Sequence, residues 1–284
     1  MSYDALHSVR RCRDYHLYTA DGKRYLDMYL NGGRALLGHK PAGLSLILKT
    51  EIQKGLMAEV PTAFSRRLEK ALLRLATAAP RKESPPRGGS PGAVFRLRLY
   101  ANFDRALTAA AALLGKSFTE QDIAEPFFAS PGDPVYFRPC TTVDYTRFPV
   151  LFPVLPFPAG FAPQPLLYKD VQGQPPASDA VSPLLAAGLT RLAENLSSAA
   201  EELQTGGEFP DIWKEWRLPG WTRFGCYCFR TTSENYAHLA NRFFAAGLII
   251  SPAPGRPTIL PRLFSPGEQR LVERLCSETF GRNT

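Results

Sequence analysis

The sequence predicts a mixed α/β protein of 284 residues. Segments in which apolar residues alternate with polar ones, as is typical of strands, are interleaved with segments in which apolar residues recur every three or four positions, as is typical of amphipathic helices. Hydrophobic residues make up 44% of the chain and charged residues 21%, the balance of a globular protein that buries a core. No apolar run reaches the roughly 18 residues that a membrane span needs, and residues 1–13 lack the apolar core of a signal peptide.

Strands are predicted over 15–19, 24–29, 94–100, 225–230 and 248–250. The first two form a hairpin, because Asp21-Gly22 supplies the positive φ that a tight turn requires. Residues 80–92 are rich in Pro, Gly and Ser and are predicted to be a loop. Prolines recur too often between residues 125 and 176 for long helices, so we expect short strands and loops there.

Helices are predicted over 41–52, 63–76, 104–114, 183–203, 236–246 and 265–276. Pro41 suits a first helical position because its φ is already helical. Gly247 is a candidate for the C-terminal cap of the fifth helix. Ser265 and Glu268 have the spacing of a capping box, so the last helix should begin there.

The net charge of +8 is unevenly spread, with about +11 in residues 1–116 and about −3 in the rest. A basic half can attract nucleic acid, but these basic residues are interspersed with apolar ones at helical spacing, which favours solvated helix faces. The five cysteines are scattered and odd in number, which indicates reduced thiols in a cytoplasm. Cys226 and Cys228 are expected to pack in the core rather than to bind metal.

Three segments resemble the class III aminotransferases and glutamate-1-semialdehyde aminomutases. The first contains Asp21-Gly-Lys-Arg-Tyr-Leu-Asp27, Asn31-Gly-Gly33 and Leu37-Gly-His39. The second, Ser182-Pro-Leu-Leu-Ala-Ala-Gly-Leu-Thr-Arg-Leu192, is similar to the helix that the family places downstream of its catalytic lysine. The third, residues 237–275, is similar to the family's C-terminal small domain. Together these segments cover about half of the chain and occur in the family's order.

The resemblance implies the type I fold of transferases that depend on pyridoxal phosphate (PLP), working as a homodimer. Residues 1–60 and 215–284 would form the small α+β domain. Residues 61–214 would form a reduced remnant of the large domain, with the loop at 80–92. The family's large domain is built on a seven-stranded sheet, and at most about 120 residues remain for it here.

PLP chemistry needs a lysine for the imine, an acid that faces the ring nitrogen, and an anion-binding turn for the phosphate. The turn would fall at Tyr100-Ala-Asn-Phe-Asp-Arg-Ala106, with Asn102, Asp104 and Arg105 as the candidate cofactor-binding residues. The turn lacks the family's Ser-Gly-Ser/Thr pattern, so a capped helix without a ligand is the competing interpretation.

Lys169 is the candidate catalytic residue, because it is the only lysine between Lys116 and Lys214 and follows a predicted strand. A solvated turn lysine is the alternative. The stretch that aligns with the family's acidic pair, residues 150–158, contains no acid. Asp144 and Asp170 lie on either side of it and are expected to be surface or turn carboxylates.

Three hypotheses of function remain open. The first is a catalytically degenerate aminotransferase-like protein, without cofactor, that has a binding or assembly role as a homodimer. The second is a minimal active PLP-dependent aminotransferase or aminomutase that uses Lys169. The third is a basic module that binds nucleic acid or an acidic partner. Its candidate residues are Arg10, Arg11, Arg13, Arg66, Arg67, Arg96 and Arg98. The first is preferred, and no membrane association is expected.

Overall fold

The computed structural model describes residues 3, 6, 8–55, 58, 60, 62–77, 95–157, 162–169, 173–204, 220–230, 232, 234–263 and 265–280. The chain divides into two compact units, which are residues 1–41 with 206–284, and residues 42–205. The loop expected at 80–92 lies outside the described residues. Within the described part, no helix is both long enough and apolar enough to cross a bilayer.

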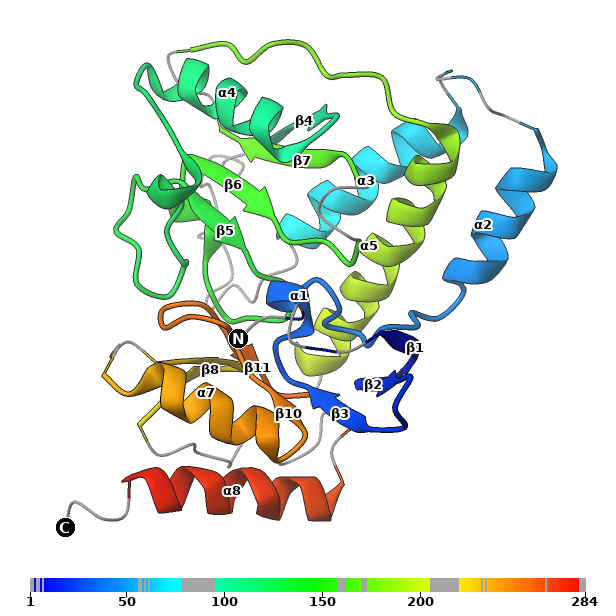
Figure 1. Ribbon diagram of the computed structural model, residues 1–284. Coiled ribbons are helices and arrows are strands. Elements are labelled where there is room, and N and C mark those ends of the chain that lie inside the picture. The colour runs from blue at the N-terminus through cyan, green and yellow to red at the C-terminus, as the bar shows by residue number, and fades with distance from the viewer. Residues whose placement is uncertain are drawn as a thin grey trace. The chain divides into compact units, whose positions relative to one another are not determined.

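The first unit contains a four-stranded sheet in the order β1-β2-β3-β10 and a three-stranded sheet in the order β11-β9-β8. Strands β3 and β10 run parallel, and the other neighbouring pairs are antiparallel. Its strands are β1 Val9–Arg13, β2 His16–Thr19, β3 Arg24–Asp27, β8 Thr222–Phe224, β9 Tyr227–Phe229, β10 Leu248–Ile249 and β11 Thr258–Ile259. Its helices are α1 Leu30–Gly33, α7 Tyr236–Ala245 and α8 Pro266–Phe280 (Figure 1).

Local signals set the ends of several of these elements. Gly22, at φ +81°, turns the β2–β3 hairpin. Gly247, at φ +82°, follows α7 as the expected C-terminal cap. The capping box of α8 is confirmed, because the Glu268 amide donates to Ser265 Oγ at 3.2 Å and the Ser265 amide donates to Glu268 Oε2 at 3.0 Å.

The strand predicted over 225–230 is shorter in the structure, where β9 covers only Tyr227–Phe229. Gly225, at φ +61°, lies in the turn that joins β8 to β9. Strand β8, which precedes this turn and pairs with β9, was not predicted. Cys226 and Cys228 are both fully buried.

The second unit contains a four-stranded sheet in the order β4-β7-β6-β5, flanked by helices (Figure 1). Its strands are β4 Arg96–Tyr100, β5 Val135–Phe137, β6 Val150–Pro153 and β7 Gln164–Tyr168. Its helices are α2 Leu44–Gln53, α3 Ala63–Thr77, α4 Phe103–Leu114 and α5 Pro183–Gln204, with 3-10 turns η2 Glu120–Asp122 and η3 Tyr145–Arg147.

Helix α4 packs one alanine-rich face on this sheet. Ala106, Ala109 and Ala110 are fully buried against aromatic and aliphatic side chains of β4, β6 and β7. Small residues let the helix backbone approach the strands closely, so the turn between β4 and α4 is held firmly against the sheet. The proline-rich stretch 150–157 is buried throughout, as expected for a core segment.

Candidate functional site

The candidate site is an edge of the sheet in the second unit. Strands β5 and β6 are parallel, and both β6 and β4 run antiparallel to β7. Strands β4, β5 and β6 therefore share one direction, and their carboxyl ends meet at one edge, at Tyr100, Phe137 and Pro153. Ligands of open α/β sheets bind outside the carboxyl ends of the strands. We call this edge the carboxyl edge.

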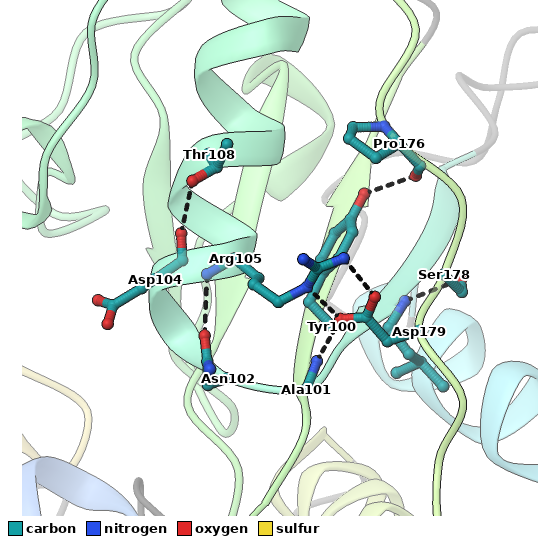
Figure 2. A network of polar contacts seen from close by, with 10 residues as sticks. Tyr100, Ala101, Asn102, Asp104, Arg105, Thr108, Pro176, Ser178 and Asp179 are labelled. Atoms are coloured by element: carbon teal, nitrogen blue, oxygen red, sulfur yellow. Dashed lines mark hydrogen bonds and ion pairs between the residues drawn. The ribbon is translucent and has the colours of Figure 1, made fainter. Parts of the chain in front are cut away.

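Asn102 and Arg105 lie at this edge, where the chain leaves β4 and enters α4. The Asn102 side chain accepts a hydrogen bond from the Arg105 amide at 2.9 Å, so it caps the helix. Asp104 lies in the first turn of α4, and its carboxylate points away from this contact (Figure 2). Asn102 therefore satisfies one of the free amides that a phosphate would otherwise use.

The Arg105 guanidinium is bound by a carboxylate of the same chain (Figure 2). Its Nε lies 2.6 Å from Asp179 Oδ2, and its Nη2 lies 2.5 Å from Asp179 Oδ1. The same Oδ2 accepts the Ala101 amide at 2.8 Å. These bonds, from Arg105 first and from the Ala101 amide second, hold the pKa of Asp179 below its usual range. Asp179 thus occupies the position where an external anion would be expected.

The segment that carries Asp179 is attached along the outer side of β4. The Leu99 amide donates to Ser178 Oγ at 3.1 Å, and the Asp179 amide donates to the Leu99 carbonyl at 2.8 Å. The Tyr100 hydroxyl donates to the Pro176 carbonyl at 2.9 Å, and burial raises the pKa of this phenol to about 12. The segment therefore covers the edge strand and fixes the carboxylate.

A second ion pair lies where β5 ends. The Arg138 guanidinium contacts the Glu125 carboxylate, with Nε–Oε2 3.0 Å and Nη2–Oε1 2.5 Å. Only 5% of Arg138 is exposed. The Tyr145 hydroxyl accepts from the Arg138 amide and donates to its carbonyl, both at 2.9 Å, and burial raises the pKa of Tyr145. Two carboxylates at this edge, Asp179 and Glu125, are thus each neutralised by an arginine.

Lys169 follows β7 and lies at the opposite edge of the sheet. Tyr168 pairs with Arg96 at the start of β4, whereas Gln164 pairs with Tyr100 at its end. Accordingly the Lys169 Nζ lies over the Phe95 ring, 5.7 Å from its centroid. Phe95 and Asn102 are seven residue steps apart, which corresponds to about 23 Å of extended chain.

The structure therefore does not bring Lys169 together with Asn102, Asp104 and Arg105. A separation of this size is far more than one small coenzyme can bridge. Removal from water lowers the pKa of Lys169, although attraction to Asp144 opposes this. Asp144 itself accepts from the Thr146 amide at 2.9 Å, as a turn carboxylate does, and Asp170 lies outside the described residues.

These residues do not fit pyridoxal phosphate. No lysine occurs in the sequence between Pro153, the last residue of β6, and Gln164, the first residue of β7. Residues 154–157, which directly follow β6, are apolar and buried, so they offer no acid to a ring nitrogen. Within the described ranges, no group of three or more His, Cys, Asp or Glu side chains is placed to hold a metal.

The first unit explains why the N-terminal sequence motif has its form. Asp27 is fully buried, and its Oδ1 accepts the Tyr29 and Leu30 amides at 3.0 and 2.9 Å. Its Oδ2 lies 3.0 Å from His39 Nε2 and accepts the Tyr3 hydroxyl at 2.6 Å. The last residue of the hairpin motif is thus tied to the histidine of the Leu-Gly-His step. The motif has a structural role here.

Sequence reasoning missed Asp179, Arg138 and Glu125. Nothing in the local sequence singles them out, since each has a partner at least 13 residues away along the chain.

The arginines of the basic-module hypothesis are distributed over β1, α3 and β4, in both units. Some contact neighbouring side chains, as Arg11 does over the Tyr18 ring at 4.5 Å and Arg67 does with Glu194 at 3.2 Å.

Solved structures similar to this chain are aminotransferases. Ornithine aminotransferase of Plasmodium yoelii superposes with a TM-score of 0.62 at 12% identity, over 96% of this chain and 93% of that one. N-acetylornithine aminotransferase of Stenotrophomonas maltophilia gives a TM-score of 0.57 at 13% identity, over 99% and 97% of the two chains. At such identities the likeness is one of fold.

The proteins that are similar in sequence are uncharacterized, so they do not indicate an activity. An uncharacterized protein of Treponema pallidum is 25% identical over 301 aligned residues, which cover 90% of this chain and 89% of that protein. An uncharacterized protein of Borreliella burgdorferi is 44% identical over 61 residues, only 22% of this chain and 23% of that protein. No protein-family model matches the chain. The chain therefore has the fold of the PLP-dependent aminotransferases, and its activity must be argued from its own residues.

Proposed function

We propose that this chain is a catalytically degenerate aminotransferase-like protein with a binding or assembly role and without bound PLP. The observation that carries the proposal is the position of Lys169 at the sheet edge opposite Asn102 and Arg105. Imine formation needs the amine beside the aldehyde while the anion-binding turn holds the phosphate. A coenzyme seated at the turn would lie out of reach of this amine.

The ion pair between Arg105 and Asp179 supports the same proposal. A phosphate at the start of α4 would have to displace a carboxylate that already accepts from the guanidinium and from the Ala101 amide. Displacement would leave Asp179 charged, without these partners and close to the incoming anion. Like charges at such a distance repel, so binding of a phosphate there is disfavoured.

Incubation of the purified protein with PLP, followed by borohydride reduction and peptide mapping, tests the proposal. We expect no visible absorbance from an imine and no stoichiometric adduct at any single lysine. Surface lysines react slowly with any aldehyde, so Lys116, exposed after α4, measures this background. The proposal would be overturned if one lysine were modified stoichiometrically while Lys116 remained unmodified.

The minimal active enzyme is the second candidate, and the lowered pKa of Lys169 favours it. A lysine of lowered pKa has a larger neutral fraction at any given pH than an ordinary lysine, and the neutral amine is the nucleophile. This candidate requires an adduct at Lys169 that is lost in Lys169→Ala. If Lys169 were modified no faster than Lys116, the active-enzyme candidate would be excluded, and the catalytically degenerate protein would remain.

Assembly as a homodimer in a cytoplasm belongs to the same proposal. The resemblance to class III aminotransferases supports the dimer, and the presence of five free cysteines supports a reducing compartment. The chain has a mass of 31.4 kDa, so light scattering during size-exclusion chromatography distinguishes one copy from two. A monomer at micromolar concentration would contradict the dimer.

A further inference from the structure

Helices α3 and α5 pack side by side as parallel helices in the second unit (Figure 1). Arg67 Nη2 lies 3.2 Å from Glu194 Oε1, and Arg74 Nη2 lies 2.5 Å from Glu201 Oε1. Both pairs join residues 127 positions apart, so the helices run in the same direction and in register. The two pairs are seven residues apart, which is about two helical turns or 10 Å.

A groove lies midway between these two ion pairs. At this level α3 presents Lys70 and Ala71, and α5 presents Ser197 and Ser198. Alanine and serine are short, so the helices leave an open volume of about 270 Å³ there. The lining residues are Arg67, Lys70, Ala71, Arg74, Glu194, Ser197 and Ser198.

The groove carries an excess of positive charge. Arg67, Lys70 and Arg74 line it, Glu194 is bound to Arg67, and Glu201 is bound to Arg74, which leaves a balance of about +1. Lys70 is exposed and forms no ion pair with any carboxylate in the described part of the chain. Arg67 uses one terminal nitrogen for Glu194, and a guanidinium has about five donors. Several donors thus converge on the groove from one helix.

Hydroxyl groups complete the lining from the other helix. Ser197 is buried and donates to the Ala193 carbonyl at 3.0 Å, so its proton is already used. Ser198 is exposed at the same level, and its hydroxyl can donate to a ligand oxygen. One face of the groove therefore supplies cations, and the other supplies the Ser198 hydroxyl together with the Glu194 carboxylate, which is bound to Arg67.

We propose that this groove binds a small phosphomonoester dianion. A phosphomonoester, which carries between about −1.5 and −2 at neutral pH, is attracted by the net positive charge of the groove. Its three terminal oxygens match Lys70, Arg67 and the Ser198 hydroxyl as donors. The volume lies near the lower end for small-molecule sites, so the organic part of the ligand is small.

A nucleic-acid strand fits this groove less well. The Arg67–Glu194 and Arg74–Glu201 pairs close the groove at both ends, about 10 Å apart. A strand would have to continue across both pairs, with a carboxylate facing its phosphates at each. The proposal is independent of the proposed function, since none of the groove residues lies at the carboxyl edge.

Titration calorimetry with inorganic phosphate as the probe, at constant ionic strength set with chloride, tests the proposal. We expect saturable one-site binding with a Kd of about 1 mM or tighter. Lys70→Gln should weaken it at least about fivefold, because this variant loses the lining cation that has no carboxylate partner among the described residues. Ser198→Asp should abolish it by placing a carboxylate inside the groove. Both positions are exposed, so circular dichroism should show an unchanged fold.

Arg66→Gln is the matched control. Arg66 is adjacent to Arg67 on α3 and exposed but does not line the groove, so its loss removes one charge from the helix without touching the site. An equal weakening by Arg66→Gln and Lys70→Gln would overturn the proposal, because it would indicate non-specific attraction. Absence of saturable phosphate binding would overturn it as well. So would binding of a short single-stranded oligonucleotide without binding of phosphate.

Discussion

The Arg105 guanidinium and the Asp179 carboxylate form a two-bond fork at the start of α4, although 74 residues separate them in the chain. This carboxylate is the anion that the N-terminus of α4 and the guanidinium attract. Together with the backbone contacts of Leu99, the ion pair attaches the 176–179 segment to the edge strand β4.

Replacement of Asp179 by alanine should lower the free energy of unfolding by about 1 to 2 kcal/mol, because the Ala101 amide and the guanidinium lose a charged acceptor. Urea denaturation followed by circular dichroism measures the loss. Asp104→Ala is the control, since Asp104 lies in the same helical turn but points away from the fork. Equal losses in the two variants would show that helix-dipole attraction, and not the fork, accounts for the effect.

The same ion pair should make stability depend on pH in the acid range. The pKa of Asp179 is lower in the folded chain than in the unfolded chain. The contribution of Asp179 to the free energy of unfolding is therefore complete at pH values above its pKa in the unfolded chain, about 3.9. It is lost as the pH falls through its lower pKa in the folded chain. Asp179→Asn should flatten the decline of stability below about pH 4 relative to the unaltered chain. Parallel declines measured by urea denaturation from pH 5 to pH 2.5 would contradict this.

Elements with a local signal were predicted well from the sequence. Asp21-Gly22 fixed the first hairpin, and the Ser265–Glu268 capping box fixed the start of α8, because both signals act within four residues. Strand β1 was missed, since all five of its residues are exposed and no alternation of apolar and polar residues marks it. The turn at Gly225 was missed because the strands that flank it have only three residues each.

The site depended on information that the local sequence does not carry. The cap formed by Asn102 follows from its position before a helix. The sheet edge on which Lys169 lies depends on the antiparallel direction of β7 relative to β4, which residue alternation does not encode. Asp179 reaches Arg105 only because its segment follows the outer side of β4. The position of Lys169 and the contact between Asp179 and Arg105 are therefore both set by tertiary structure.

Asp27 should be the most sensitive carboxylate of the first unit. Asp27→Ala removes the acceptor of two amides, the Tyr3 hydroxyl and His39 inside the protein, so we expect a loss of about 3 kcal/mol or more. Asp27→Asn keeps an acceptor for the amides and should cost clearly less. Urea denaturation of the two variants measures the difference. If Asp27→Ala lowered the free energy of unfolding no more than Asp21→Ala in the exposed hairpin turn, the network would be of minor importance for stability.

Gly38, the glycine of the Leu-Gly-His step, should not tolerate a side chain. It has φ +86°, and an added Cβ would lie 3.0 Å from the Asp14 carbonyl oxygen. Gly22 has nearly the same φ, +81°, but no atom within 4 Å of an added Cβ. Gly22→Ala therefore measures backbone strain alone, about 1 kcal/mol, and Gly38→Ala should cost more because the His39 amide donates to the same carbonyl. Equal thermal shifts for the two variants would contradict the role of this close contact.

Cys12 should be the first thiol to react in the native protein. It is exposed on β1, whereas Cys140, Cys226, Cys228 and Cys276 are buried. Burial raises the pKa of Cys228 and of Cys276 to about 12, so their thiolates are scarce at neutral pH as well as inaccessible. Partial burial, with the charge of Asp27 second, also raises the pKa of Cys12, so Cys12 should react more slowly than a peptide thiol.

A chromogenic disulfide reagent at pH 8 measures this difference. We expect one equivalent to react rapidly in the native chain and all five after denaturation in urea. Cys12→Ser should abolish the rapid phase and leave the total at four. A rapid phase that persisted in this variant would mean that a segment carrying one of the four buried cysteines opens on the timescale of labelling, because a buried thiol reacts only when its segment separates from the core.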